Sequence, residues 1–349
     1  MIILGFDIGG ANIKAALIKD GDISETYLKY YPMWTSDLSK LSEILTDVVE
    51  NISGNFNIDA IAVTMTAELS DAFYTKREGI VHIMNSLNDV FEDKDDRLYF
   101  INIYGEFIRV DDVLHDPLQV AAANWAATSK FLGEIFKDCI LIDIGSTTTD
   151  IIPILNTLPL TYGKSDTDRL ISGELVYTGV LRTEIPSITH KVVYREQECP
   201  ISSEKFALSA DVHLLLDHIN ITEYKIDTAD GRKKNRKDSM ARIARIICSD
   251  IELLSEEEIL KICRYINSQQ IKKIQSALEK VITSIEYKDI FQLPVIVTGL
   301  GSNFLANKAA LNLGFKKIIN LDEKFGKKGN IIAPSAAIAL LLEKKLMDE

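Results

Sequence analysis

The chain has 349 residues, of which 46% are hydrophobic and 26% are charged, and its formal net charge at pH 7 is −12. This length predicts two domains with an ample hydrophobic core, so folding needs neither a disulfide framework nor a structural metal. The acidic balance excludes a general electrostatic attraction to nucleic acid, and no run approaches the roughly 18 apolar residues of a membrane span.

The first elements predicted along the chain form a β-meander. Residues 2–8 are apolar enough for a central strand, Gly9-Gly10 makes a tight turn, and strands follow at 13–18 and at about 23–31. Apolar periodicity then predicts a helix, two strands and an alanine-rich helix, over 36–51, 58–65, 97–103 and 117–132.

The opening pattern recurs about 136 residues later. Residues 139–146 form an apolar strand that ends in Asp-Ile-Gly, as residues 4–10 do, and 148–155 return as its hairpin partner. The repeat predicts two similar lobes. We place the first at 1–135 plus a closing helix at 333–349, and the second at 136–332 with an insertion at about 160–232.

The second lobe continues with a mixture of elements. The insertion has β-strand and turn character with poor periodicity. The elements predicted after it are two helices, a strand, a helix, a strand and the closing helix, over about 235–249, 255–285, 295–298, 303–313, 316–320 and 334–346.

The first glycine turn, in Asp7-Ile-Gly-Gly-Ala-Asn-Ile-Lys14, is typical of an anion site. Gly9 and Gly10 offer backbone N–H groups with no side chain in the way, and Asn12 and Lys14 can reach phosphate oxygens. Asp7 ends a strand, where it can hold Mg²⁺ directly or through water. A plain hairpin with a solvated lysine is the alternative interpretation.

The second turn, in Asp143-Ile-Gly-Ser-Thr-Thr-Thr-Asp150, adds hydroxyl groups to the backbone donors. We predict phosphate binding at Gly145, Ser146, Thr147 and Thr148, with metal-binding carboxylates at Asp143 and Asp150. A threonine run can also reflect β-propensity alone. Finding both turns in one chain favours the functional interpretation.

A third turn, in Val297-Thr-Gly-Leu-Gly-Ser-Asn303, joins a strand to a helix. Gly299, Gly301 and Ser302 allow a flat or polar ligand group to approach the backbone closely. In this position they predict a nucleotide-like loop.

The three turns together resemble the two phosphate loops and the adenosine loop of the actin, sugar kinase and heat-shock ATPase superfamily. The resemblance covers nearly the whole chain. It implies an α/β fold of two lobes, the duplicated ribonuclease H-like fold of actin-like ATPases, with a cleft between the lobes. The first two turns should then face each other across that cleft. A bound ATP or other nucleotide is possible within this architecture.

A narrower resemblance is to the hydantoinase/oxoprolinase-related branch, and within it to an archaeal family of methanofuran-biosynthesis enzymes. It rests on the second turn and on the segments 63–73, 173–183 and 228–232. That family joins a furan-methyl diphosphate to γ-glutamyltyramine and releases diphosphate. The resemblance therefore implies an alkyl or aryl transferase with a phosphorylated small-molecule substrate and Mg²⁺.

The catalytic carboxylates expected for such a reaction are Glu68, Asp71 and Asp143, with Glu68 as the base. Glu68 and Asp71 follow the 58–65 strand, although an acid pair at a helix start would look the same. The basic run from Arg232, with Arg242 and Arg245, suggests a diphosphate clamp, or else a solvated face. Diphosphate inhibition of alanine variants at Arg242 and Arg245 would separate these two interpretations.

Other interpretations remain open. The generic phosphate turns also fit an ATP-dependent small-molecule kinase or a non-catalytic nucleotide sensor, whereas an amide hydrolase lacks a visible metal or nucleophile constellation. His213 and His218, five residues apart, are not expected to share a helical face or a role. The cysteine usage fits a reducing compartment, so we expect a cytoplasmic protein without nucleic-acid or membrane partners.

Overall fold

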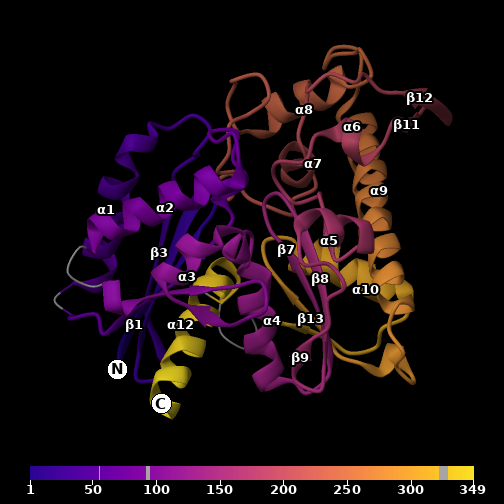
Figure 1. Ribbon diagram of the computed structural model, residues 1–349. Coiled ribbons are helices and arrows are strands. Elements are labelled where there is room, and N and C mark those ends of the chain that lie inside the picture. Colours follow the sequence, from indigo (N-terminus) through magenta and orange to yellow (C-terminus); the bar gives the residue numbers. More distant parts are fainter. Residues whose placement is uncertain (55, 92–94, 322–328) are drawn as a thin grey trace. The chain divides into compact units, whose positions relative to one another are not determined.

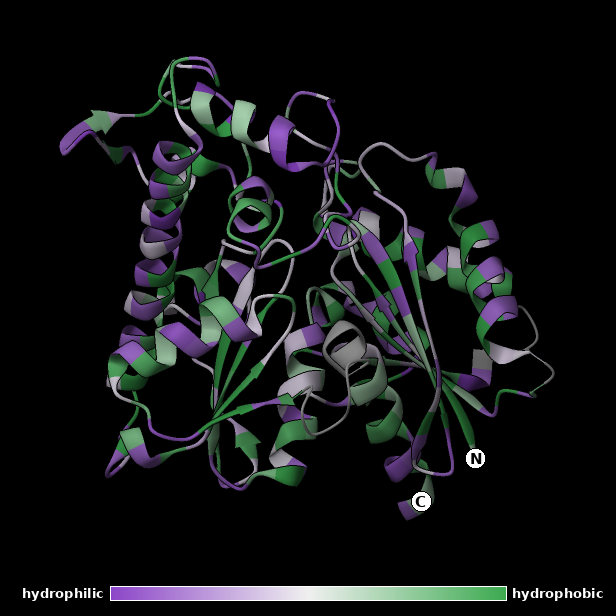
Figure 2. Cartoon of the chain, turned by 180° about the vertical axis from the view of Figure 1, so that it is seen from behind, coloured by the Kyte–Doolittle hydropathy of each residue, from purple (hydrophilic) through white to green (hydrophobic). Residues whose placement is uncertain are grey.

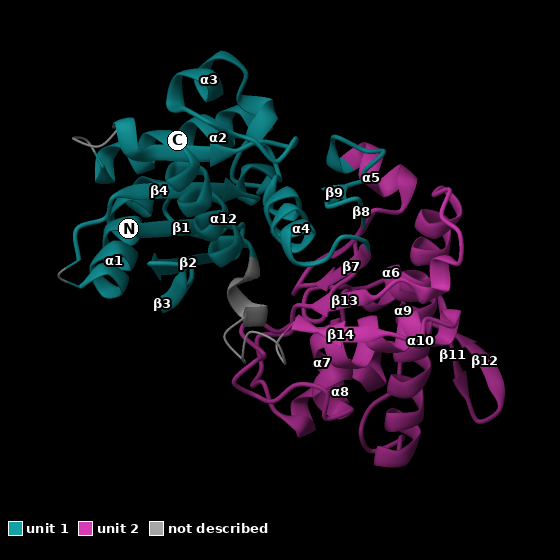
Figure 3. Ribbon diagram, turned by 90° about the horizontal axis from the view of Figure 1, so that it is seen from below, with its two compact units in different colours: residues 1–138, 154–166, 322–349 teal, residues 139–153, 167–321 magenta. Residues whose placement is uncertain are grey.

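The computed structural model describes residues 1–54, 56–91, 95–321 and 329–349 and divides the chain into two compact units (Figure 3). Unit 1 contains residues 1–138, 154–166 and 322–349, and unit 2 contains 139–153 and 167–321. The sequence analysis assigned residues 154–166 to the second lobe. In the structure this segment belongs to unit 1, although the residues just before it, up to 153, belong to unit 2. The stretch 322–328 of the predicted second lobe lies outside the described residues.

Unit 1 is built on a six-stranded sheet with the order β3-β2-β1-β4-β5-β6 (Figure 1). Antiparallel pairing of β1 with β2 sets Asp7 opposite Lys14, and parallel pairing of β1 with β4 sets Asp7 level with Thr64. The strands, in chain order, are Ile2–Ile8, Asn12–Lys19, Asp22–Tyr30, Ala60–Met65, Leu98–Ile101 and Phe107–Ile108.

Helices cover both faces of this sheet because β1 is apolar on both sides. Leu4, Phe6 and Ile8 belong to the core beneath α1 and α2, whereas Ile3 belongs to the core beneath α4 and α12. A Cβ on Gly5 would lie 2.0 Å from the Ser335 carbonyl oxygen, so only glycine allows α12 to lie this close. The helices are α1 Leu41–Ser53, α2 Lys76–Val90, α3 Val110–His115, α4 Asn124–Ile135 and α12 Gly329–Asp348, with 3₁₀ turns Leu38–Lys40, Ala67–Leu69, Asp95–Arg97 and Pro117–Val120.

Unit 2 has a sheet of the order β10-β8-β7-β13-β14, in which β7 pairs antiparallel with β8 and parallel with β13. The hydropathy colouring in Figure 2 is largely hydrophobic along the central strands and mixed along α9. The strands are β7 Cys139–Ile144, β8 Thr149–Leu155, β10 Leu175–Val176, β13 Val295–Thr298 and β14 Ile318–Asn320, and the short β9 Leu158–Pro159 pairs with the end of β8 that belongs to unit 1.

The predicted insertion at about 160–232 contains more helix than its strand and turn character indicated. It shares a small core of its own with the two helices that follow, through residues such as Ile185, Val212, Ile243 and Ile262. Its elements and the remaining helices of unit 2 are α5 Asp166–Ser172, α6 Ile185–Ile188, β11 Lys191–Tyr194, β12 Gln197–Pro200, α7 Ser209–Leu215, α8 Arg236–Arg245, α9 Glu256–Thr283, a 3₁₀ turn Ile290–Gln292, a π-helical turn Ser302–Ala306 and α10 Asn307–Leu313.

The two units repeat one another at their first hairpins. The Gly9 N–H donates to the Asn12 carbonyl at 2.9 Å, and the Gly145 N–H donates to the Thr148 carbonyl at 3.0 Å. The first strand of each hairpin also pairs in parallel with a later strand, β1 with β4 in unit 1 and β7 with β13 in unit 2. The repeat confirms the predicted duplicated α/β fold of actin-like ATPases. Among the described residues, no helix combines the length and the apolar character needed to cross a membrane.

Candidate functional site

The first glycine turn presents backbone donors toward open space. The carbonyl groups of Gly10 and Ala11 accept hydrogen bonds from the N–H groups of Met33 and Tyr31, at 2.9 and 3.0 Å. Within residues 1–54 and the other described ranges, the N–H groups of Gly10 and Ala11 have no acceptor. A Cβ on Gly10 would meet nothing within 4 Å. The turn is therefore held from behind and can accept an anion in front, as predicted for Gly9 and Gly10.

Buried oxygen atoms without partners gather beside this turn. Asp7 is 3% exposed, and its Oδ2 accepts a hydrogen bond from Lys14 Nζ at 2.9 Å. Its Oδ1, together with Asn12 Oδ1 and Thr64 Oγ1, lacks a hydrogen-bond partner among the described residues. Buried polar atoms of native proteins are nearly always satisfied, so a ligand is expected here. Oxygen donors of this kind fit Mg²⁺.

Glu68 lies just beyond the end of β4 in the Ala67–Leu69 turn, as the sequence indicated. It is 1% exposed, and neither carboxylate oxygen has a partner in the described part of the chain. Burial raises the pKa of Glu68 to about 7, with smaller opposing effects of nearby backbone N–H groups and of Lys76. Gly79 of α2 packs against its backbone, where a Cβ would lie 2.7 Å from Glu68 Cα. Asp71, in contrast, is exposed.

The second turn, in unit 2, is held from behind in the same way. The Gly145 carbonyl accepts from Val180 N–H at 3.0 Å, and the Ser146 carbonyl accepts from Leu181 N–H at 2.9 Å. Gly179 lies so close that its Cβ would be 2.5 Å from Thr147 N. The N–H groups of Ser146 and Thr147 have no acceptor among the residues that the structure describes. Segment 177–183 therefore shapes a second donor turn.

The carboxylates of unit 2 are placed differently from Asp7. Asp150 Oδ1 accepts from Arg169 Nη2 at 2.6 Å, and Arg169 is 2% exposed. This buried ion pair counts against Asp150 as a metal ligand. The described residues contain no group of three His, Cys, Asp or Glu side chains that could hold a metal. Because Asp7 belongs to the other unit, a shared site with Asp143 remains a prediction.

The third turn packs against the end of β7. Gly299 has φ +83°, and a Cβ there would lie 2.4 Å from Asp143 Oδ1. A Cβ on Gly301 would lie 2.6 Å from Ile144 Cγ2. Close packing thus accounts for both glycines without a ligand. Ser302 is buried at the start of the π-helical turn, and a nucleotide-like role for this loop stays a prediction.

The arginines of the basic run pair with carboxylates of the chain, which was not predicted. Arg242 is fully buried, and its guanidinium donates to Asp211 at 2.7 Å, to Asp230 at 3.0 Å and to Ser239 at 3.0 Å. Because these groups occupy the donors that a phosphate would need, the predicted role of Arg242 as a phosphate clamp is wrong. Arg245 also pairs with Asp230, at 2.9 Å, and Arg232 lies exposed 3.7 Å from the same carboxylate.

Sequence reasoning missed a buried network behind the second turn. Gln270 Nε2 donates to Thr178 Oγ1 at 3.1 Å and to the Gly179 carbonyl at 2.9 Å, so its Oε1 must accept from His213 Nε2, which lies 3.0 Å away. Burial lowers the pKa of His213 to about 3 and also lowers the pKa of His218. A neutral His213 protonated at Nε2 accepts at Nδ1 from His218 Nδ1, at 3.1 Å.

The two histidines meet because α7 ends between them. The sequence argument assumed a continuing helix, but the chain turns back at Asp217, whose φ is +57°. Phe304 of the π-helical turn lies against both rings, at centroid distances of 4.8 and 4.5 Å. An isolated positive-φ aspartate after a short helix carries no sequence pattern that distinguishes it from an ordinary loop residue.

Comparisons with known proteins agree with this geometry. The family model of Hydantoinase/oxoprolinase matches residues 59–345. A (4-{4-[2-(gamma-L-glutamylamino)ethyl]phenoxymethyl}furan-2-yl)methanamine synthase of Methanocaldococcus jannaschii is 36% identical over 99% of both chains. A protein of the same name from Methanococcus vannielii is 36% identical over 61% of this chain and 94% of its own. The nucleotide-free structure of acetone carboxylase has a TM-score of 0.53 at 12% identity, covering 97% of this chain and 70% of that chain, which shows a common fold alone.

Proposed function

The chain belongs to the hydantoinase/oxoprolinase family, and we propose that it is a (4-{4-[2-(gamma-L-glutamylamino)ethyl]phenoxymethyl}furan-2-yl)methanamine synthase of methanofuran biosynthesis. The proposal rests on the 36% identity over 99% of both chains. The compound in that name contains an aryl ether, so the reaction forms a bond between a phenol oxygen and a furan-bearing methylene. We assign it to the transferases that move an alkyl group.

The leaving group in this proposal is diphosphate. The bond between the methylene carbon and the diphosphate oxygen breaks, and the electron pair leaves with the diphosphate. The furan ring delocalises the positive charge that develops on the methylene. The phenol oxygen of γ-glutamyltyramine then attacks this carbon, and the phenol proton must go to a base. Atoms and charges balance without an oxidant, a reductant or a nucleotide.

Glu68 is the base in this scheme. A carboxylate with a pKa of about 7 is ionised in half of the molecules at neutral pH, and it takes a proton more readily than an ordinary glutamate. Its burial keeps water from competing for the same role. Both oxygens lack hydrogen-bond partners within the described residues, so either could accept the proton of a phenol hydroxyl that gains access to the buried carboxylate.

Each unit by itself offers donors to an anionic group such as the diphosphate. In unit 1 these are Lys14 and the N–H groups of the first turn. In unit 2 they are Ser146, Thr147 and Thr148. A magnesium ion fits the unpaired oxygens of Asp7, Asn12 and Thr64, which would hold it. When bound, the ion neutralises negative charge on the leaving group. A cytoplasmic location belongs to the same proposal.

The test is mass spectrometry of the purified protein incubated with both substrates and Mg²⁺ in the absence of nucleotide. We expect the ether, with one diphosphate released for each ether formed. Phosphorylation of a small alcohol on addition of ATP would instead indicate a kinase. ATP binding without turnover of any of these substrates would indicate a nucleotide sensor. Either result contradicts the synthase assignment if no ether appears.

A further inference from the structure

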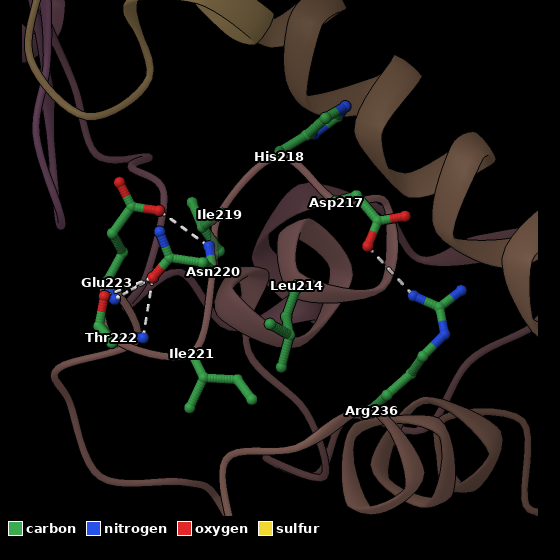
Figure 4. A pocket seen from close by; sticks show the side chains of 9 residues that line it. All are labelled: Leu214, Asp217, His218, Ile219, Asn220, Ile221, Thr222, Glu223 and Arg236. Carbon is green, nitrogen blue, oxygen red and sulfur yellow. Dashed lines mark hydrogen bonds and ion pairs between the residues drawn. The ribbon is translucent and has the colours of Figure 1, made fainter.

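Unit 2 contains a pocket of about 730 Å³, lined by Leu214, residues 217–223 and Arg236 (Figure 4). None of these residues belongs to a glycine turn. The close-up places Asp217 and Arg236 at one side of this pocket and Asn220, Thr222 and Glu223 at the other. Leu214 and Ile221 lie between the two polar sides. The pocket thus offers an apolar middle with charged groups at its edges.

The Asp217 side of the pocket carries a loose ion pair. Arg236 Nη1 lies 3.4 Å from Asp217 Oδ1, and the Asp217 side chain is 85% exposed. Such an exposed pair stabilises the protein little. The guanidinium itself is fixed, because Nε donates to Glu256 at 3.1 Å and Nη1 donates to the Leu215 carbonyl at 3.1 Å. Across the described residues, Arg236 Nη2 has no hydrogen-bond partner.

The opposite wall is preformed by local hydrogen bonds. Asn220 Oδ1 accepts from the N–H groups of Thr222 and Glu223, at 2.9 and 3.1 Å, and the Asn220 N–H donates to Glu223 Oε2 at 2.8 Å. A wall ordered before a ligand arrives loses little entropy on binding.

The charges of the pocket select the kind of ligand. Asp217 and Glu223 line the pocket and Glu256 pairs with Arg236, so three negative charges stand against the one positive charge of Arg236 and a free diphosphate is repelled. A ligand with both an ammonium and a carboxylate group can exchange the loose ion pair between Asp217 and Arg236 for two. The apolar middle suits a linker or ring, because Ile221, which lines it, is 57% exposed.

We propose that this pocket binds the γ-glutamyl end of the acceptor substrate through its α-amino and α-carboxylate groups. Arg236 takes the carboxylate, Asp217 takes the ammonium group, and the tyramine part lies on Leu214 and Ile221. This assignment rests on the proposed function, since the relatives' product carries a γ-glutamylamino group. It adds a determinant of specificity within unit 2.

The buried network connects this pocket with the second turn. His218 lines the pocket, and the hydrogen bonds from His218 through His213 and Gln270 end at Gly179. Gly179 is the residue that packs against Thr147. Three buried or half-buried side chains therefore fix the spacing between the pocket wall and the turn that is expected to hold phosphate.

The test is isothermal titration calorimetry of γ-glutamyltyramine and of N-acetyltyramine, which keeps the amide and lacks the two charged groups, with the full chain, three test variants and one control variant. Asp217→Asn and Arg236→Gln should weaken γ-glutamyltyramine binding by about 10- to 100-fold, as loss of a charged hydrogen bond does, and should leave N-acetyltyramine binding unchanged. Ile221→Glu, at an exposed position that should not disturb folding, should weaken both ligands. Arg195→Gln removes another exposed arginine ion pair of unit 2 and serves as the control.

The outcomes separate this assignment from the proposed function. If wild-type protein makes the ether but neither charge variant changes γ-glutamyltyramine binding, the pocket assignment fails and the synthase assignment stands. An equal loss for N-acetyltyramine and γ-glutamyltyramine in the charge variants also overturns the assignment, because it shows a general disturbance. If γ-glutamyltyramine does not bind the wild type, the pocket assignment is overturned, and ether formation measured separately decides whether the function fails with it.

Discussion

The hairpin turns of the two units share a backbone design and differ in what surrounds them. In both, the glycine N–H closes the hairpin and a later segment donates to the carbonyl groups of the turn. Around the first turn, however, oxygens of Asp7, Asn12 and Thr64 have no partner among the described residues. Around the second, Asp150 is neutralised by Arg169 and segment 177–183 packs against the turn.

This difference predicts a division of roles. Unit 1 keeps buried acceptors that are available to a metal or a proton, whereas unit 2 fixes a rim of hydroxyl and N–H donors that suits an anion. A duplicated strand pattern can therefore conserve the geometry of a turn while the side chains next to it take different chemistry.

The largest contrast is expected between Asp7→Asn and Asp150→Asn. The first should lower ether formation by at least about 100-fold with a small effect on unfolding, because it removes a charge from the candidate metal site. The second should lower the free energy of unfolding by about 3–5 kcal/mol, because it removes the negative charge that pairs with the buried Arg169. Activity assays and urea unfolding measure the two effects, and equal defects in both variants would contradict the division of roles.

Acid should destabilise unit 2 through His213. The folded pKa of about 3 lies below the ordinary value of 6.5, so between these values the unfolded chain binds a proton that the folded chain does not. The contribution of His213 to stability should therefore fall with falling pH, by about 1.4 kcal/mol per unit, or about 2 kcal/mol from pH 6.5 to 5. Urea unfolding across this range should show this slope in the difference between the wild type and His213→Gln, because Glu68, whose pKa is raised, contributes a slope of the opposite sign to both proteins. A variant that keeps the wild-type slope would show that His213 is not the group responsible.

A smaller effect is expected from Gln270→Leu, which removes the support of Gly179 behind the second turn. We predict about 10-fold weaker binding of the diphosphate substrate, seen as a raised KM with a nearly unchanged kcat. Gln269→Leu, at the neighbouring position, is the control. A fall in kcat with an unchanged KM would instead place Gln270 in the chemical step and not in positioning.

The repeating core of both units follows from the sequence because strand periodicity and the two Asp-Ile-Gly turns are local patterns. The ends of β13 were predicted to the residue, since a proline precedes it and a glycine follows it. The insertion was harder because α5, α6 and α7 have seven, four and seven residues, too few for a helical period to appear. The helix α2 was not predicted, although Thr75 caps it.

The candidate site was predictable where it depends on the turns and unpredictable where it depends on tertiary pairing. Glu68 was selected from its position after β4, and its burial fits that choice. The burial of Arg242 could not be predicted from a basic run, because its two partners lie outside α8. Asp211 is 31 residues away in the sequence and belongs to α7, and Asp230 lies in the loop before α8. The same holds for the His213 and His218 pair, which depends on one left-handed residue.

If Glu68 of unit 1 removes the phenol proton, ether formation must depend on pH through the ionisation of this residue. Single-turnover rates should be measured from pH 5.5 to 8.5 for the wild type and for Glu68→Gln. Because Glu68 must be ionised to act as a base, the wild-type rate should rise about tenfold per unit and level off above its pKa of about 7. The variant should be at least about 100-fold slower and show no rise near pH 7. An unchanged profile in Glu68→Gln would contradict the account.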